Sequence, residues 1–489
     1  MEKYYLAVDI GASSGRHILG RLENGKIELE EIYRFENGMD HKDGKLLWDV
    51  NRLFGEIVAG MKKCKELGKI PVSMAIDTWA VDYVLLDEKD QILGDTYGYR
   101  DHRTDGMDAE VAKVLPETEL YGKTGIQKQI FNTVYQLMAV KQQTPELLQQ
   151  AKTLLMLPDY FGFRLTGNKL SEYTNGSTTQ LVNPDTFQWD KELIRKLGYP
   201  EDIFLPLQMP GTKVGQLLPE IQKEVGFDLE VVLCGSHDTA SAVMAVPQTE
   251  GDGIYISSGT WSLMGIESLK PVITEDAAAA NFTNEGGYDH RFRFLKNIMG
   301  LWMIQSVRHE YNDAYSFAQL CDMAEESKEF PSRVDVNDQS FLSPDSMVEA
   351  IRQYCHKTGQ PVPESVGELT SVVYRSLAQS YGETVRGLEK IAGKTYDSIH
   401  IIGGGSNAAY LNQLTADATG KTVYAGPGEA TAIGNLLAQM IHAGDQGGQR
   451  ERRTGIQHQR PTYQEPQRKP AAADRCLREE RHEIGRAHV

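Results

Sequence analysis

Asp9 and the small residues that follow it form the first group in this chain that could do chemistry. Asp9 stands near the end of an apolar run, and a turn of small residues, Gly11 to Gly15, leads from it to Arg16. Small residues let backbone N–H groups approach phosphate oxygens, so the pattern fits a phosphate-and-metal site. The same residues also suit an ordinary hairpin turn. It is not a Walker loop, because the Gly-Lys-Ser/Thr ending is absent and the turn leads into a strand.

Two later segments of small residues could complete a nucleotide site. Ser257-Ser258-Gly259-Thr260 forms a second turn, rich in hydroxyl groups. Two such turns facing each other could hold a triphosphate between them. Gly403-Gly404-Gly405 would let an adenine or ribose lie close to the backbone, although a tight turn between a strand and a helix explains it equally well.

Asp238 is the candidate base. It lies between an apolar run, Glu230 to Cys234, and an expected helix, Ala240 to Val246. One interpretation is that Ser236, Asp238 or Thr239 only caps this helix. The other is that it orients a hydroxyl group, with a pKa that the helix N-terminus lowers so that it stays ionised. Phosphoryl transfer needs no stronger base, because its loose transition state depends mainly on positioning and charge neutralisation.

Asp77, Thr78 and Trp79 end another expected strand. A carboxylate, a hydroxyl and an indole together suit a sugar, which offers hydroxyl groups to bind and an apolar face to stack on. A strand end with a turn and a core tryptophan is the equally good alternative.

Alternating and helical patterns place these groups on an α/β fold. Strands are expected at residues 4–10, 17–22, 27–35, 71–76, 253–256, 261–266, 398–402 and 422–425, and helices at 49–67, 240–246, 407–418 and 431–441. The strand-turn-strand pattern at the start returns at Gly253, which suggests a duplication. The boundary between halves is expected near Ala245 to Gly251, where the periodicity breaks. After about Ala443 the chain is rich in Gln and Arg, and we expect a poorly ordered tail.

Composition indicates a protein that handles small molecules. The 489 residues exceed a typical single domain, so two core domains are expected. A net charge of -17 disfavours nucleic acid and anionic membranes as partners. Five scattered cysteines favour a reducing compartment. No export signal or membrane span is evident, so we expect a cytoplasmic protein.

Motifs along most of the chain resemble the FGGY carbohydrate kinases. The matching segments are DIGASSGR, IDTWAVDYVLLD, YRDHRT, LPDYFGFRLTG, EYTNGSTTQL, GSHDTASAV, SSGTWSLMG, NEGG, LKNIMGLW and IIGGGSN. The resemblance implies two ribonuclease-H-like domains of the actin and sugar-kinase superfamily, with an interdomain cleft for ATP and sugar. It implies a sugar-binding, base-supplying domain at residues 1–245 and a nucleotide-binding domain at 246–443. Residues 444–489 do not resemble the family.

The resemblance also implies roles for individual residues. ATP would be bound by Ala12, Ser13, Ser14, Gly15, Arg16, Thr260, Gln305 and Gly404, and Asp9 would face Mg²⁺ through water. The sugar would be held by Ala80, His237, Asp238, Thr239 and Asn297, in addition to Asp77 and Trp79. Asp238 would accept the proton of the sugar hydroxyl. Ala80 stands where the family usually has a glycine, and its added methyl group would tighten the pocket.

The activity implied is ATP-dependent phosphorylation of a ketose at O1. L-rhamnulose is the expected ketose, and L-fuculose and D-xylulose are the alternatives within the family. An actin-like or chaperone-like ATPase is the alternative from another class, because it could use the same two turns. Such an ATPase would leave Asp77, Trp79 and Asn297 without a role.

Overall fold

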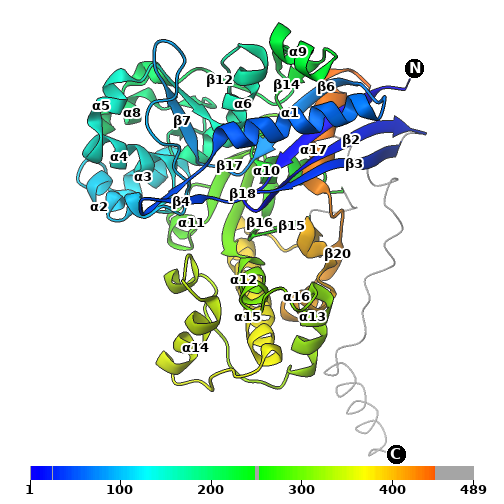
Figure 1. Cartoon of the computed structure of the whole chain (residues 1–489). Helices are drawn as coiled ribbons and strands as arrows, with labels where there is room; N and C mark the ends of the chain where they lie inside the picture. Colours follow the sequence, from blue (N-terminus) through cyan, green and yellow to red (C-terminus); the bar gives the residue numbers. More distant parts are fainter. Residues whose placement is uncertain (1, 25, 248–252, 446–489) are drawn as a thin grey trace, which may run out of the picture. The chain divides into compact units, whose positions relative to one another are not determined.

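The computed structural model describes residues 2–24, 26–247 and 253–445, and two six-stranded sheets dominate them (Figure 1). The described residues divide into two compact units. The first holds residues up to 247, Leu263–Asn297 and 429–445, and the second holds 253–262 and 298–428. The expected tail from residue 446 onward, with Cys476, lies outside the described residues.

The first sheet has the strand order β13-β14-β6-β1-β2-β3. Its strands are β1 (Tyr4–Ile10), β2 (Ser14–Glu23), β3 (Lys26–Glu36), β6 (Pro71–Thr78), β13 (Lys213–Gln216) and β14 (Glu230–Val232). The three N-terminal strands expected from the sequence are confirmed, and they pair in antiparallel order. β2 begins three residues earlier than expected, because Ser14 and Gly15 already pair with β3. β1 also pairs in parallel with β6, as a helix crossover requires.

Helix α1 (Val50–Glu66) makes that crossover and lies beside β3 (Figure 1). Asp49 caps its N-terminus by accepting from the N–H groups of Asn51 and Arg52. Its apolar face, which includes Leu53 and Ile57, is fully buried in the core of the first unit. Because the cap and the buried face agree, the helix matches its expected bounds closely.

Helix α17 (Ala430–His442), late in the chain, also belongs to the first unit and packs on β1, β6 and α10. Its Gly434 is required, since a Cβ there would lie 1.7 Å from the carbonyl oxygen of Ser241. The remaining helices of this unit are α2 (Met107–Ala112), α3 (Glu117–Thr124), α4 (Thr133–Gln143), α5 (Pro145–Gln150), α6 (Leu157–Thr166), α7 (Tyr173–Gly176), α8 (Lys191–Leu197), α9 (Pro219–Val225), α10 (Asp238–Met244) and α11 (Glu275–Ala279).

The second sheet has the order β17-β18-β16-β15-β19-β20. Its strands are β15 (Ile254–Ser258), β16 (Trp261–Ser268), β17 (Thr283–Gly286), β18 (Phe292–Met299), β19 (Ser398–Ile402) and β20 (Thr422–Ala425). The neighbour order β18-β16-β15-β19-β20 repeats the order β3-β2-β1-β6-β14 of the first sheet, with a hairpin beside a parallel pair in both. The repeated topology supports the duplication that the sequence pattern suggested.

The second unit carries α12 (Trp302–Glu310), α13 (Phe317–Glu326), α14 (Met347–Lys357), α15 (Val366–Ala392) and α16 (Ala409–Thr419). The long α15 packs against α13 and α16 (Figure 1). A capping box of Ser365 and Glu368 starts α15, and Gly393 in the left-handed region ends it. α16 begins two residues later than expected, because a 3₁₀ turn at Gly404–Asn407 precedes it.

Eight short strands outside the two large sheets pair among themselves. They are β4 (Asp40–Lys42), β5 (Lys45–Leu47), β7 (Tyr83–Leu86), β8 (Thr153–Met156), β9 (Ser171–Glu172), β10 (Val182–Asn183), β11 (Gln188–Trp189) and β12 (Leu207–Gln208). Among the described residues, no helix has both the length and the apolar character needed to cross a membrane.

Candidate active site

Three carboxylates come together where β1 and β6 end and α10 begins. Asp9 and Asp77 are register partners in the parallel pair β1–β6. Thr78 forms a parallel β-bridge with His237, so Asp238, the next residue, lies beside the end of β6. Burial raises the pKa of Asp77, and the charges of Asp9 and Asp238 raise it further. The pKa shift therefore shows that the three acids repel one another, so a positive charge bound here would be stabilised.

The turn after β1 is arranged for phosphate. Gly11 closes it by donating to the carbonyl oxygen of Ser14 at 2.9 Å, and Asn37 donates to the carbonyl oxygen of Gly11 at 2.8 Å. In the described part of the chain, the backbone N–H groups of Ala12 and Ser13 have no recorded acceptor. Free N–H groups on a turn of small residues are suited to an anion such as phosphate.

Arg16 closes the charge balance of this turn. Its guanidinium donates twice to Asp9 Oδ2, at 2.9 and 3.0 Å, and pairs with Glu429 at 2.9 Å. Both hydrogen bonds end on the same oxygen, so Oδ1 of Asp9 is left for another ligand. Glu429, which precedes α17, was not expected from the sequence.

The carboxylates suit Mg²⁺, although no ion is part of the structure. Asp77 is fully buried, and its Oδ1 has no hydrogen-bond partner among the described residues. Hard oxygen donors of this kind are typical Mg²⁺ ligands, and Mg²⁺ keeps several waters when phosphates complete its shell. Asp9 and Asp77 are therefore the residues that would hold it, directly or through water.

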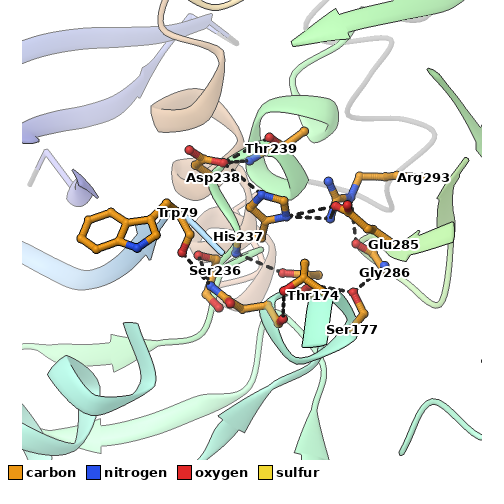
Figure 2. A network of polar contacts seen from close by, with 12 residues as sticks. Trp79, Thr174, Ser177, Ser236, His237, Asp238, Thr239, Glu285, Gly286 and Arg293 are labelled. Atoms are coloured by element: carbon orange, nitrogen blue, oxygen red, sulfur yellow. Dashed lines mark hydrogen bonds and ion pairs between the residues drawn. The ribbon is translucent and has the colours of Figure 1, made fainter. Parts of the chain in front are cut away.

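Asp238 has one carboxylate oxygen occupied and one available. Oδ1 accepts from Thr239 N at 2.5 Å and from Thr239 Oγ1 at 3.1 Å, and it lies 3.3 Å from His237 Nε2 (Figure 2). Within the described residues, Oδ2 has no recorded hydrogen bond. The sugar hydroxyl that the resemblance assigns to Asp238 would meet this free oxygen.

The expectation that a helix N-terminus lowers the pKa of Asp238 was wrong. Burial raises the pKa, and the nearby Asp9 charge adds to the increase, while His237 and Thr239 act in the opposite direction. α10 is only seven residues long, and its macrodipole does not outweigh the loss of solvent around this carboxylate.

A buried carboxylate at the end of β9 holds the segment that carries the base. Glu172 Oε2 accepts from the Ser236 hydroxyl at 2.6 Å, and its two oxygens also accept from the backbone N–H groups of Thr174 and Asn175. Thr174 Oγ1 in turn accepts from His237 N at 3.3 Å. Glu172 and Thr174 thus hold Ser236 and His237 in place.

Trp79 packs in the core instead of presenting its ring. Its indole lies 4.0 Å from that of Trp48, and both indole N–H groups donate to Asp82, at 2.9 and 2.6 Å. Burial raises the pKa of Asp82 to about 6 against these donors. The ring of Trp79 therefore fits the second interpretation, a core tryptophan. Its carbonyl oxygen shares the Asn175 side-chain amide with the carbonyl oxygen of Ser236, close to the site.

Ala80 is half-buried and borders a strained residue. Val81 has a left-handed φ of 67°, which is costly for a β-branched side chain. Its carbonyl oxygen accepts from Thr133 Oγ1 at 2.7 Å, a contact that helps to hold this conformation. The turn at Ala80 is thus a fixed feature of the first unit.

The remaining predicted site residues divide between the units. Asn297, on β18 in the first unit, is half-buried, and no hydrogen bond of its side-chain amide to another described residue is recorded. Thr260, Gln305 and Gly404 belong to the second unit, where Thr260 and Gln305 are partly exposed and Gly404 is exposed. A Cβ on Gly404 would meet nothing within 4 Å, so this position is open to a ligand.

Two buried charged residues near His237 were missed in the sequence. Glu285 and Arg293 are direct partners on the antiparallel strands β17 and β18, and both contact the His237 ring (Figure 2). The NEGG motif includes Glu285, but it served only for the resemblance. A better signal in the sequence was Arg293, a charged residue between Phe292 and Phe294. Alternation along the strand suggests that Arg293 faces solvent, but in the structure it is fully buried.

The comparisons with known proteins identify the family of this chain. Residues 4–245 match the N-terminal domain of the FGGY family of carbohydrate kinases, and residues 254–443 match the C-terminal domain of that family. The chain belongs to the FGGY family of carbohydrate kinases. Within the family it is 55% identical over 442 residues to a rhamnulokinase of Halalkalibacterium halodurans, covering 90% of this chain and 94% of that relative. It is 46% identical to a rhamnulokinase of Bacillus subtilis, covering 90% of each.

Solved structures confirm the fold. A ligand-bound xylulose kinase from Lactobacillus acidophilus matches with a TM-score of 0.76 at 16% identity, covering 99% of both chains. A Plasmodium falciparum glycerol kinase with ADP matches with a TM-score of 0.74 at 14% identity, covering 100% of this chain and 99% of that one. The two-domain α/β fold expected from the sequence is that of sugar kinases.

Proposed function

We propose that this chain transfers the γ-phosphate of ATP to the O1 hydroxyl of L-rhamnulose, giving L-rhamnulose 1-phosphate and ADP in L-rhamnose catabolism. Two curated relatives at 55% and 46% identity carry the name rhamnulokinase and match over 90% of this chain, which supports this sugar. The observation in the site that carries the proposal is Asp238, a partly buried carboxylate with one oxygen held by Thr239 and the other without a hydrogen bond to any described residue. We place the reaction in the cytoplasm, where ATP is supplied.

The residues act by positioning and charge balance. His237, Asp238, Thr239 and Asn297 hold the sugar, with Asp77 and Ala80 beside it. Asp238 accepts the O1 proton as the hydroxyl oxygen attacks the γ-phosphorus, and ADP leaves. Mg²⁺ supplies positive charge to the phosphates, and Asp9 and Asp77 are the groups that would bind it.

The nucleotide is assigned to residues from both family domains. The N–H groups at Ala12 and Ser13 are available for phosphate oxygens, and Ser14, Gly15 and Arg16 complete that turn. The side chains of Thr260 and Gln305 make no hydrogen bond to another described residue, and Gly404 offers open space beside its backbone. We therefore assign the base and the sugar contacts other than Asn297 to residues 1–245. The nucleotide contacts are assigned to the turn at residues 12–16 and to three positions within residues 246–443.

A panel of ketoses in an ADP-release assay tests the choice of sugar. L-rhamnulose should give the highest kcat/KM, and L-fuculose and D-xylulose should be turned over less well. A clear preference for another ketose would reject L-rhamnulose but retain the kinase. ADP release at the same rate without any sugar would favour the ATPase alternative.

Asp238→Asn tests the base. The amide cannot accept the hydroxyl proton, so turnover should fall by about 100- to 10,000-fold, the usual range for loss of a general base. ATP binding, measured by titration calorimetry, should change little, because none of the residues assigned to ATP is altered. Turnover near that of the unmodified enzyme would remove Asp238 from its role.

A further inference from the structure

Glu285, Arg293 and His237 form a buried cluster behind the base. The side chains of Arg293, Glu285 and His237 are 0%, 6% and 8% exposed. Arg293 Nη2 lies 3.1 Å from Glu285 Oε2, and Arg293 Nε donates to the carbonyl oxygen of Gly286 at 2.8 Å. These contacts fix the guanidinium against one edge of the His237 ring (Figure 2).

A gain in folding stability does not explain why Glu285 and Arg293 are buried here. Removing two charges from water costs about as much as their attraction returns, so apolar residues would serve a core equally well. Arg293 Nη1 is buried without a hydrogen-bond partner in the described structure, which adds to that cost. Burial works to raise the pKa of Glu285, but Arg293 and His237 outweigh it, so the pKa lies below its ordinary value and the pair stays charged.

The donors around His237 determine where its ring carries a proton. Nδ1 lies 3.1 Å from Arg293 Nη2 and 3.3 Å from Glu285 Oε2, and Nε2 lies 3.3 Å from Asp238 Oδ1. A guanidinium can only donate, so a neutral ring must present its Nδ1 lone pair to Arg293 and carry its proton on Nε2. A cationic ring would donate from Nδ1 to Glu285 and still carry a proton on Nε2. The neutral tautomer with the proton on Nδ1 would point a donor at Arg293 and a lone pair at a carboxylate.

We propose that Glu285 and Arg293 are positioning residues that hold His237 with its Nε2–H directed at Asp238 Oδ1. His237 and Thr239 then satisfy Oδ1, and Oδ2 alone is left to accept the proton of the substrate hydroxyl. Neither Glu285 nor Arg293 needs to touch the sugar. The inference rests on the proposed role of Asp238 as the base. It adds the groups that determine which of the two Asp238 oxygens accepts the proton.

The first test is the double variant Glu285→Gln with Arg293→Met. It removes both charges together, so no lone buried charge remains to unfold the protein. We expect kcat to fall about 10- to 100-fold, as for a small misplacement of a reacting group, while the KM for ATP is unchanged. A matched control is Glu389→Gln with Lys421→Met, which removes a partly buried ion pair of 2.6 Å in the second unit. The control should keep its kcat.

The pH profile and a variant cycle separate positioning from structural support. Asp9 and Asp77 also face Asp238, but the double variant leaves both unchanged. His237 lowers the pKa of Asp238, so loss of the His237 donor should raise that pKa. The acidic limb of kcat/KM should then move to higher pH. In a His237→Gln background, the double variant should cost little more, because both changes act through one ring. Additive losses, or an unchanged acidic limb, would overturn the inference.

Nitrogen NMR of the sugar-free protein labelled with ¹⁵N-histidine gives a readout that does not need the substrate. His237 is assigned by loss of its signals in His237→Gln. In the unmodified protein its Nε2 should be protonated, and in the double variant this preference should disappear. A protonated Nδ1 with a bare Nε2 in the unmodified protein would reject the inference even if the ketose panel supports the kinase. Conversely, failure of every ketose would leave this measurement valid.

Discussion

Two hairpins occupy the same position in the two sheets but carry different chemistry. The turn between β1 and β2 follows Asp9, which is paired to Arg16 across the hairpin. The turn between β15 and β16 follows Ser257, the second-last residue of its strand as Asp9 is of β1. It has no charged residue from Ser257 to Thr260. The same backbone unit thus presents an ion pair in one copy and hydroxyl groups in the other.

The second hairpin packs against glycines instead of charges. Ser258 lies against the loop after β19, where a Cβ on Gly405 would be 1.9 Å from Ser258 Oγ and one on Gly403 would be 3.0 Å from the Ser258 carbonyl oxygen. In the proposed function, the first hairpin would balance charge at the reacting phosphate, and the second would offer a surface for the nucleotide. The two copies share a backbone arrangement and differ in the side chains at their turns.

Asp9→Asn should have the largest effect on this comparison. The amide keeps the shape of the turn but removes the negative charge that faces Arg16 and the expected Mg²⁺. We expect kcat to fall about 100- to 1,000-fold, the range for losing one preorganised electrostatic group, with a higher Mg²⁺ requirement. The matched variant Ser257→Ala should change kcat less than about threefold, since a partly exposed hydroxyl contributes little. Equal losses in the two variants would break the proposed division of roles.

The pH profile reports on the charged hairpin as well. Burial, with Asp9, raises the pKa of Asp238 above the ordinary aspartate value of 3.8. A base must be ionised to accept a proton, so kcat/KM should be constant near neutral pH and fall as the pH drops through this raised pKa. Thr260→Val, on the uncharged hairpin, should leave the profile in place. An acidic limb at or below the ordinary value would show that the Asp238 pKa is not raised in the working enzyme.

Gly405→Ala should show whether packing at the second hairpin affects stability as well as ATP binding. The added methyl group overlaps Ser258, so the free energy of unfolding should drop by about 1–3 kcal/mol, and the KM for ATP should rise. Gly404→Ala is the control, because its methyl group meets nothing within 4 Å. It should leave the unfolding free energy unchanged and raise only the KM for ATP. Denaturant titration and steady-state kinetics measure both, and a destabilised Gly404→Ala would contradict the open position.

Thr260→Val should have the smallest effect. It removes one hydroxyl group from the second turn, worth about 0.5–1.5 kcal/mol, so the KM for ATP should rise about 2- to 12-fold with kcat nearly unchanged. Thr260→Ser keeps the hydroxyl and should behave like the unmodified enzyme. A large fall in kcat for Thr260→Val would mean that the uncharged hairpin also acts on the transition state.

Local patterns in the sequence were enough to predict some of the elements. Alternation identified β1, β2 and β3, and the helical spacing from Leu53 to Met61 identified α1, because these elements bury one face against a core. Small residues at both turns and a carboxylate at Asp9 indicated phosphate chemistry, since backbone access and charge are local properties. The motif order indicated the family, which the comparisons confirm.

Only the tertiary structure decided which buried charges meet and how they titrate. Glu429 reaches Arg16, and Glu285 and Arg293 reach His237, across separations in the chain that no spacing rule covers. The pKa of Asp238 was misjudged for the same reason: the helix N-terminus is visible in the sequence, but burial and the Asp9 charge come from distant segments. Neighbouring residues in the sequence determine local backbone geometry. Solvation and electrostatic energies depend on every group that the fold brings close.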